Sequence, residues 1–350
     1  MRLQRFRNNL PSGIDAALVT CELNVRYLSG VDYTDGFLLI SRDKAFLFAD
    51  SRYIEVAKRD KADGFTVVLL NKRRTELIAE YMPSVKTLGY EENTVTCAEL
   101  SAYQKGLQNV EFQPMGAIVE ELRNEKSDVE IEYTVKAQRI AERAFEHILG
   151  FISPDVTEAD VALELEYFMR KNGADGIAFD TIAASGRASS MPHAVPRNVK
   201  LEKGFLTMDF GAKYNGYCSD MTRTVCIGNP TDEMKKVYYT VLDAQKAALG
   251  FIAAGKKCAD ADNSARSIIK NAGYGECFGH SLGHGVGLYI HERISLSPRS
   301  EGVLKKGNIV TVEPGIYLEG RFGVRIEDMV CVTEDGNINL TKAPKELIIL

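Results

Sequence analysis

The chain has 350 residues, of which 45% are hydrophobic and 26% are charged, and its formal net charge is -5 with a pI near 5.7. This length exceeds the size at which one hydrophobic core usually stops growing, so we expect two folded domains. The acidic balance argues against a nucleic-acid partner, and no apolar stretch has the length of a membrane span or the form of a secretory signal.

The first third of the chain alternates short β-prone runs with helical patterns. We expect strands at residues 16–19, 37–40, 45–48 and 66–70, and helices at 51–58 and 75–81. This alternation predicts an α/β domain with a partly parallel sheet. The region carries no Gly-rich dinucleotide fingerprint and no catalytic spacing.

A helical pattern runs from about Val119 to Ile152 and is interrupted by a polar stretch at residues 123–128. We place the domain boundary there, which predicts domains at residues 1–125 and 126–350. Residues 157–172 are predicted as a helix, because they begin with the N-cap signal Thr157-Glu158-Ala159-Asp160 and end before a glycine. Beyond this helix the pattern favours mostly strands and hairpins.

Two aspartates lie on a predicted hairpin. Residues 205–211 are predicted as one strand and residues 216–224 as its return strand, joined by a turn that contains the favoured pair Asn-Gly. Paired strands of this kind place Asp209 and Asp220 side by side. An aspartate after a strand more often caps a turn, so these two carboxylates alone do not define a site.

A glycine-rich segment at residues 279–288 contains two histidines, His280 and His284. Each glycine costs conformational entropy, so this density indicates tight backbone geometry or close approach to a ligand. A loop with hydrogen-bonded polar histidines is the alternative. It loses ground because four of the five histidines in the chain fall in candidate segments, His193 and His291 being the other two.

Two glutamates end apolar runs near the C-terminus. Glu313 closes a buried-looking strand at residues 309–313 and is followed by a Pro-Gly turn. Residues 323–328 alternate so that Arg325 and Glu327 face the same side of a predicted strand. A cross-strand ion pair is the ordinary role of an isolated glutamate, and it stays open for each of them.

Taken together, Asp209, Asp220, His284, Glu313 and Glu327 predict a two-metal hydrolytic site. Four adjacent carboxylates repel one another unless divalent cations or an equally dense set of Lys and Arg balances them. The single imidazole favours metal, and a carboxylate-rich set with one His suits Mn, Co, Fe or Zn. The seven cysteines are scattered and never spaced as Cys-x-x-Cys, which predicts reduced thiols in a cytoplasmic protein.

These segments, in this order and at these separations, resemble the pita-bread metallopeptidase family M24, which includes methionine aminopeptidase, aminopeptidase P and prolidase. The resemblance covers roughly Glu130 to Leu350 and implies an α+β chain with a C-terminal pita-bread (creatinase/aminopeptidase) fold. Residues 15–20 and 24–30 resemble the smaller α/β creatinase/prolidase-type N-terminal domain, which favours the proline-specific branch. The implied activity is metal-dependent hydrolysis of the Xaa-Pro bond in small peptides with proline at the second position.

The resemblance also implies how the metals are held. Asp220 and Glu327 are expected to bridge two divalent ions, with Asp209 on one ion and His284 with Glu313 on the other. Mn or Co is favoured over Zn or Fe. A water or hydroxide shared by the two ions is then the attacking species, because two adjacent ions lower the pKa of that water toward neutrality.

For the remaining residues the resemblance implies contacts with the substrate. His193 and His291 are expected to touch the peptide and steady the oxyanion, and Glu313 to shuttle a proton. Arg325 is placed to brace the bridging glutamate or to hold a substrate carboxylate. His280 is expected to line the pocket rather than bind metal.

One departure from the family pattern is visible, because His291-Glu292-Arg293-Ile294 lacks the proline of the common His-Glu-x-Pro sequence. The affected loop lies beside the substrate, so the departure bears on side-chain preference. Tyr289 and Phe179 are candidate walls for the proline ring. Relatives with this two-domain layout commonly form homodimers, which we also expect here.

Two alternatives stay open at this point. One is a creatinase-like hydrolase of a small non-peptide substrate, a reaction that works without the metals. The other is a non-catalytic pita-bread module that binds peptides. The complete set of five predicted ligands weighs against both.

Overall fold

The computed structural model describes residues 2–350. The chain divides into two compact units, one ending at Arg123 and the other running from Asn124 to Leu350. Within the described residues, no helix combines the length and the apolar character needed to cross a membrane.

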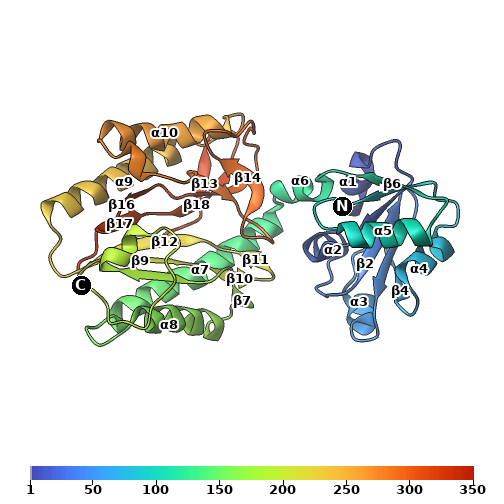
Figure 1. Ribbon diagram of the computed structural model, residues 1–350, viewed down its shortest axis with the longest axis horizontal. Coiled ribbons are helices and arrows are strands. Elements are labelled where there is room, and N and C mark those ends of the chain that lie inside the picture. Colours follow the sequence, from blue (N-terminus) through green and yellow to red (C-terminus); the bar gives the residue numbers. More distant parts are fainter. Residues whose placement is uncertain (1) are drawn as a thin grey trace. The chain divides into compact units, whose positions relative to one another are not determined.

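The N-terminal unit is built on one six-stranded sheet with strand order β4-β3-β2-β1-β5-β6 (Figure 1). The strands are β1 (Ala16–Val19), β2 (Phe37–Ser41), β3 (Ala45–Ala49), β4 (Thr66–Leu69), β5 (Thr87–Tyr90) and β6 (Glu111–Pro114). The β1–β5, β3–β4 and β5–β6 pairs are parallel, and the β1–β2 and β2–β3 pairs are antiparallel. The prediction of a partly parallel sheet is therefore confirmed.

Helices flank this sheet, which explains why β1 and β2 are apolar runs with almost no exposed residue. They are α1 (Arg2–Asn9), α2 (Glu22–Ser29), α3 (Ile54–Asp60), α4 (Arg74–Tyr81) and α5 (Cys97–Gly106), followed by α6 (Ile118–Asn124) at the boundary of the unit.

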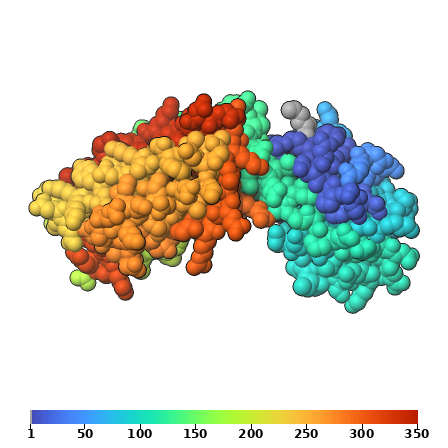
Figure 2. Space-filling view, turned by 90° about the horizontal axis from the view of Figure 1, so that it is seen from above, coloured from blue at the N-terminus to red at the C-terminus, as the bar shows by residue number. Residues whose placement is uncertain are grey.

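The C-terminal unit contains two helix pairs, which lie on opposite sides of its strands (Figure 1). The first pair is α7 (Asp128–Phe151) and α8 (Glu158–Lys171), and the second is α9 (Asp232–Phe251) and α10 (Cys258–Asn271). Helix α8 begins with the predicted capping box, in which Thr157 Oγ1 accepts a hydrogen bond from Asp160 N. Figure 2 shows α9 and α10 in yellow and orange, forming one face of this unit.

Most elements beyond α8 are strands, as predicted, but α9 and α10 are helices that were not predicted. The run Val237-Tyr238-Tyr239-Thr240-Val241 consists of residues that favour strands, and it hides the helical spacing. The buried residues Val237, Val241, Ala244 and Ala248 nevertheless recur every three or four positions. Packing of that apolar face decides the structure over local propensity.

The strands of this unit form four sheets, with orders β11-β10-β7, β12-β9-β8, β14-β13-β15-β18-β19 and β16-β17. The strands of the first half are β7 (Gly176–Ile177), β8 (Ile182–Ser185), β9 (Gly204–Phe210), β10 (Ala212–Tyr214), β11 (Tyr217–Cys218) and β12 (Met221–Ile227). Those of the second half are β13 (Gly283–Gly285), β14 (Glu292–Leu296), β15 (Ile309–Val312), β16 (Gly315–Leu318), β17 (Phe322–Arg325), β18 (Asp328–Val332) and β19 (Asn337–Asn339). Two short 3-10 helices, η1 (Gly186–Ser190) and η2 (Gly275–Cys277), complete the unit.

The predicted hairpin is present, with one difference. Asn215 and Gly216 have positive φ angles of 47° and 77° and join the paired residues Tyr214 and Tyr217, as a two-residue turn requires. The return strand, however, is split into β11 and β12. A Cβ on Gly211 would lie 1.9 Å from Ser219 O, so the chain crosses itself closely where each arm of the hairpin changes sheets.

The second predicted ligand strand is also split. It ends at Arg325 in β17, which pairs with β16, and resumes at Asp328 in β18, which pairs with β15. Asp220 lies at the break between β11 and β12, and Glu327 lies at the break between β17 and β18. In each half of the unit, one carboxylate therefore lies where the chain passes from one sheet to another, Asp220 in the first half and Glu327 in the second.

Candidate metal centre

A cavity of about 420 Å³ opens beside these breaks, and its lining contains every predicted metal ligand together with the predicted histidines and Arg325. The predicted residues are Asp209, Asp220, His284, Glu313, Glu327, His193, His280, His291 and Arg325. The cavity is also lined by Phe179, Asp180, Ile182, Pro192, Ser281 and Ile290. The fold therefore brings together side chains that are far apart in the sequence.

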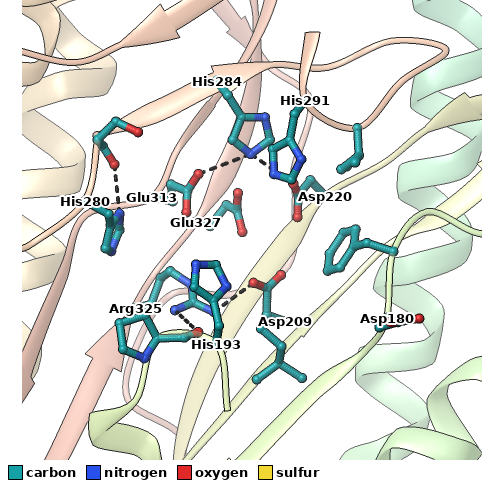
Figure 3. A pocket seen from close by; sticks show the side chains of 15 residues that line it. Asp180, His193, Asp209, Asp220, His280, His284, His291, Glu313, Arg325 and Glu327 are labelled. Atoms are coloured by element: carbon teal, nitrogen blue, oxygen red, sulfur yellow. Dashed lines mark hydrogen bonds and ion pairs between the residues drawn. The ribbon is translucent and has the colours of Figure 1, made fainter. Parts of the chain in front are cut away.

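The expected ligand atoms lie close together. His284 Nε2 is 3.3 Å from Glu313 Oε1 and 3.6 Å from Asp220 Oδ2. One ligand atom each from Asp220, His284 and Glu327 lie within 4.8 Å of one another. Figure 3 shows His284, Glu313, Glu327 and Asp220 directed toward one another. An ion bonded at roughly 2.0–2.2 Å separates its ligand atoms by about 3–4 Å, so this spacing suits a divalent cation.

The strands fix where each of these groups lies. Asp209 is on β9 opposite Thr222 of β12, and Glu313 directly follows β15. His284 is on β13, next to β15. A Cβ on the neighbouring Gly283 would lie 2.0 Å from Thr311 O, so the glycine permits the close approach that the sequence indicated.

The His284 ring is oriented for ligation through Nε2. Its Nδ1 lies 3.1 Å from Gly285 O, a carbonyl that can only accept, so Nδ1 carries the proton. Burial also lowers the pKa of His284, which keeps the ring neutral. The Nε2 lone pair therefore points at the carboxylates, which is the arrangement that a metal-binding histidine needs.

The carboxylates of the cluster are costly to ionise without a cation beside them. Burial raises the pKa of Asp220 and of Glu327 well above the ordinary range, and the neighbouring carboxylates raise both further. Burial also raises the pKa of Glu313 to about 8, although the Arg325 charge opposes this shift. Such a cluster is held in its ionised form by bound cations, so the electrostatics fit a metal site.

Among the described residues, Asp209 is the one carboxylate of the predicted set that forms an ion pair with a Lys or Arg side chain. Its Oδ2 accepts from Arg325 Nη2 at 2.7 Å, while its Oδ1 is buried without a hydrogen-bond partner. A buried carboxylate oxygen rarely stays unsatisfied, so Oδ1 is available for an ion. Together with the spacing and charge of the other groups, this atom shows that the residues present fit divalent metal.

Arg325 uses its guanidinium within the protein. Nε donates to Thr222 Oγ1 at 3.0 Å, and Thr222 Oγ1 donates to Glu327 Oε2 at 2.7 Å, so Arg325 braces that glutamate through a threonine. Nη1 donates to Tyr317 Oη and to Pro192 O. With these contacts made, the guanidinium is oriented toward protein groups.

Tyr317 is the main residue that the sequence did not reveal. Its hydroxyl accepts from Arg325 Nη1 at 2.8 Å and donates to His280 Nε2 at 2.9 Å. Burial and the Arg325 charge lower the pKa of His280 to about 4, so this ring stays neutral. The only sequence signal was the alternation of the β16 strand, which places Gly315 and Tyr317 on one face.

Arg223 connects the break between β11 and β12 to the break between β17 and β18. Its Nη1 donates to Thr222 O and to Glu327 O, and its Nη2 donates to Asp328 Oδ1 at 2.8 Å. This side chain is almost fully buried. Arg223 thus links the backbone at Thr222, two residues after Asp220, to the backbone of Glu327. These hydrogen bonds fix the distance between the segments that carry Asp220 and Glu327.

Of the two predicted walls for a substrate ring, Phe179 lines the cavity and Tyr289 does not. Tyr289 is 49% exposed. Ile182, Ile290 and Asp180 line the cavity without having been predicted. Figure 3 shows Asp180 to one side, apart from the facing carboxylates.

Comparison with known proteins gives two family matches along the chain. Residues 132–334 match metallopeptidase family M24, and residues 2–124 match the creatinase/prolidase N-terminal domain. An uncharacterized peptidase of Bacillus subtilis is 44% identical over 354 aligned residues, with 100% of each chain covered.

Two solved structures are similar over nearly the whole length. The Xaa-Pro dipeptidase of Bacillus anthracis is 45% identical with a TM-score of 0.97, covering 100% of this chain and 99% of its own. The X-Pro aminopeptidase of Thermotoga maritima is 38% identical with a TM-score of 0.92, covering 99% of this chain and 100% of its own.

Proposed function

This chain belongs to metallopeptidase family M24, and on that premise we propose that it hydrolyses the Xaa-Pro bond of small peptides with proline at the second position. One observation carries this proposal. Buried carboxylates and a neutral imidazole converge on one cavity. Among the described residues that line this cavity, Arg325 is the only Lys or Arg. The two similar solved structures are an Xaa-Pro dipeptidase and an X-Pro aminopeptidase, and both names refer to a bond to proline.

In this proposal two divalent ions are held by side chains from both halves of the C-terminal unit. Asp220 and Glu327 would serve both ions, Asp209 would hold one of them, and His284 with Glu313 would hold the other. Mn or Co is favoured over Zn or Fe, because the donors are oxygen-rich with one imidazole. When bound, two such ions lower the pKa of a shared water toward neutrality and stabilise the charge that develops on the scissile carbonyl.

The side chains that line the cavity supply the remaining functions. His193 and His291, which line the cavity, would donate hydrogen bonds to the peptide oxygen as it gains charge, and Glu313 would move a proton. Phe179, together with Ile182 and Ile290, offers an apolar wall for the proline ring. An Xaa-Pro bond lacks the N–H that general peptidases grip, so recognition by ring shape is required.

We also propose that the protein is a cytoplasmic homodimer. The two-domain layout supports the dimer, because relatives with this layout commonly form homodimers. Support for the compartment comes from the cysteines, since all seven are free and a reducing environment preserves free thiols.

A peptide series on metal-reconstituted protein tests the function. The protein is stripped with EDTA, reloaded with Mn²⁺ or Co²⁺, and assayed on Ala-Pro, Ala-Pro-Gly and Ala-Pro-Gly-Gly. We expect no hydrolysis of the stripped protein, and recovery on reloading with cleavage before proline. Cleavage of Ala-Pro alone identifies a dipeptidase, whereas cleavage of the longer peptides identifies an aminopeptidase. Full activity on Ala-Pro in the presence of EDTA contradicts the proposal.

A further inference from the structure

The segment that leads into His284 has little regular structure of its own. Residues 278–282 lie between η2 and β13, outside any helix or strand. Two glycines, Gly279 and Gly283, occur within six positions of the chain, and a Cβ on Gly279 would meet nothing within 4 Å. A chain this permissive samples many conformations unless other groups fix it. Its position matters, because His280 and His284 both line the cavity.

One pair of side chains on α10 holds this segment at Phe278 and His280 and, together with Leu296 O, at Leu282. Arg266 Nη1 donates to Phe278 O at 2.8 Å, and Arg266 Nη2 donates to His280 O at 2.7 Å. Asp262 Oδ1 accepts from Leu282 N at 3.0 Å. The groups bound belong to alternate residues, which is how one edge of a strand presents its backbone. The pair thus serves the segment as a neighbouring strand would.

The pair is itself rigid. Arg266 binds Asp262 through two parallel contacts, Nε to Oδ2 at 2.6 Å and Nη2 to Oδ1 at 2.8 Å. The guanidinium also lies over the Phe278 ring, 4.1 Å from its centroid. The Asp262 side chain is 1% exposed and that of Arg266 is 25% exposed. A planar fork locked in this way holds both carbonyl oxygens at fixed positions.

The first half of the unit lacks this device. Helix α8 has the same 14-residue length as α10, and the positions that correspond to Asp262 and Arg266 are Ala162 and Glu166. No imidazole among the predicted metal ligands comes from that half. The pair therefore occurs in the half that supplies the histidine ligand.

We propose that Asp262 and Arg266 are positioning residues, which hold residues 278–284 in the shape that presents His284 to the metal cluster. This inference rests on the proposed function, because it assigns the pair a role in metal affinity. Neither side chain lines the cavity, so neither touches the substrate.

Two variants separate this role from a role in stability alone. Arg266→Lys keeps the charge next to Asp262, but a single ammonium cannot reproduce a fork that reaches two carbonyls. Asp262→Asn removes the paired charge. The matched control is Glu132→Gln in the exposed Glu132–Lys136 pair of α7, which has the same spacing of four residues and lies outside the cavity lining.

The readouts are Mn²⁺ affinity, from competition with a chelator, and the melting temperature of the metal-free protein. We expect Arg266→Lys to lower the affinity for one of the two Mn²⁺ ions by about tenfold or more, in the range seen for groups that support a metal ligand. Its metal-free melting temperature should stay near that of the wild type. Glu132→Gln should match the wild type in both readouts.

Wild-type affinity for both ions in Arg266→Lys overturns the inference. So does a variant whose melting temperature falls while its metal affinity is kept. If Asp262→Asn fails to fold, the lysine variant still decides. Failure of the wild-type protein to bind divalent ions overturns the proposed function and the inference with it, a result that differs from a change seen in the variants only.

Discussion

The two halves of the C-terminal unit share one design and differ in what they add to it. In each half a helix pair is joined by a turn, at residues 152–157 and 252–257, and each turn forms a β-bridge, Thr157 with Lys200 and Lys257 with Val303. Strand β9 begins at Gly204 and strand β15 begins two residues after Gly307, and both glycines have a positive φ. The repeat is structural, and the sequence alone did not disclose it.

Each half then places one carboxylate at a strand end and one at a strand break. These are Asp209 and Asp220 in the first half, and Glu313 and Glu327 in the second. Only the second half adds a proposed imidazole ligand, His284, on a short glycine-rich strand that the Asp262–Arg266 pair is proposed to position. The first half instead adds the segment that carries His193. The strands that both halves share position the four carboxylates. The segments that carry His284 and His193 occur in one half each and supply the histidines.

The largest expected effect comes from removing one of the two proposed bridging carboxylates, one of which lies in each half. Asp220→Asn and Glu327→Gln should each lower kcat/KM on Ala-Pro by more than about 100-fold, the upper range for groups that only support a ligand. Each should also reduce the metal content measured per chain. If one of the two variants keeps most of its activity, the halves do not contribute equally and the bridging roles are wrong.

A second effect is the pH dependence of the metal-free protein. The folded-state pKa values of Asp220, Glu313 and Glu327 lie above their unfolded values, so the folded state binds more protons. Stability should therefore fall as pH rises from about 4 toward 8, by an amount on the order of a few kcal/mol. Urea unfolding across this range measures it. Saturating Mn²⁺ should abolish the loss at pH 8, and a metal-free protein that is equally stable at pH 5 and pH 8 would count against the buried cluster.

A smaller effect should follow from changing Glu158, the buried first residue of α8 in the first half. Glu158 is fully buried and accepts hydrogen bonds from Ser185 N and Oγ, and from Arg197 N, Nε and Nη2. Burial alone would raise the pKa of Glu158, but these hydrogen bonds hold it below its ordinary value. Its stabilisation is therefore present at neutral pH and is lost as pH falls through that lowered pKa.

Glu158→Gln should destabilise the protein by about 1–3 kcal/mol, because one acceptor of a buried network is lost. The bonds to Ser185 and Arg197 flank the segment with His193, so KM for Ala-Pro should rise while two ions stay bound. Cys258 is the corresponding residue of α10, and Cys258→Ala serves as the control with unchanged KM. A loss of metal in Glu158→Gln, with KM unchanged, would reverse the division of roles between the halves.

Much of this fold could be predicted from the sequence where the local pattern agrees with the final packing. The strands at residues 16–19 and 45–48 and the helix capped by Thr157 are found where expected. Helix α9 was missed because its β-prone run conceals a helical face that only tertiary packing stabilises. The two strand breaks were missed because alternation continues through them, and only the sheets they join show the interruption.

For the candidate site, the sequence indicated every carboxylate and histidine that lines the cavity except Asp180. Each of the indicated residues lies in a segment with a distinctive composition. Tyr317, Thr222 and Arg223 were not indicated, because a single tyrosine, threonine or arginine on an apolar strand looks the same whether it supports a site or a core. Their roles come from contacts between distant strands.

The most direct test of this account is the metal content of the protein measured together with its activity. After chelation and reloading, elemental analysis should find two divalent ions per chain, and hydrolysis of Ala-Pro should rise in step with the ions bound. Full hydrolysis by a chain that carries no divalent ion would contradict the account.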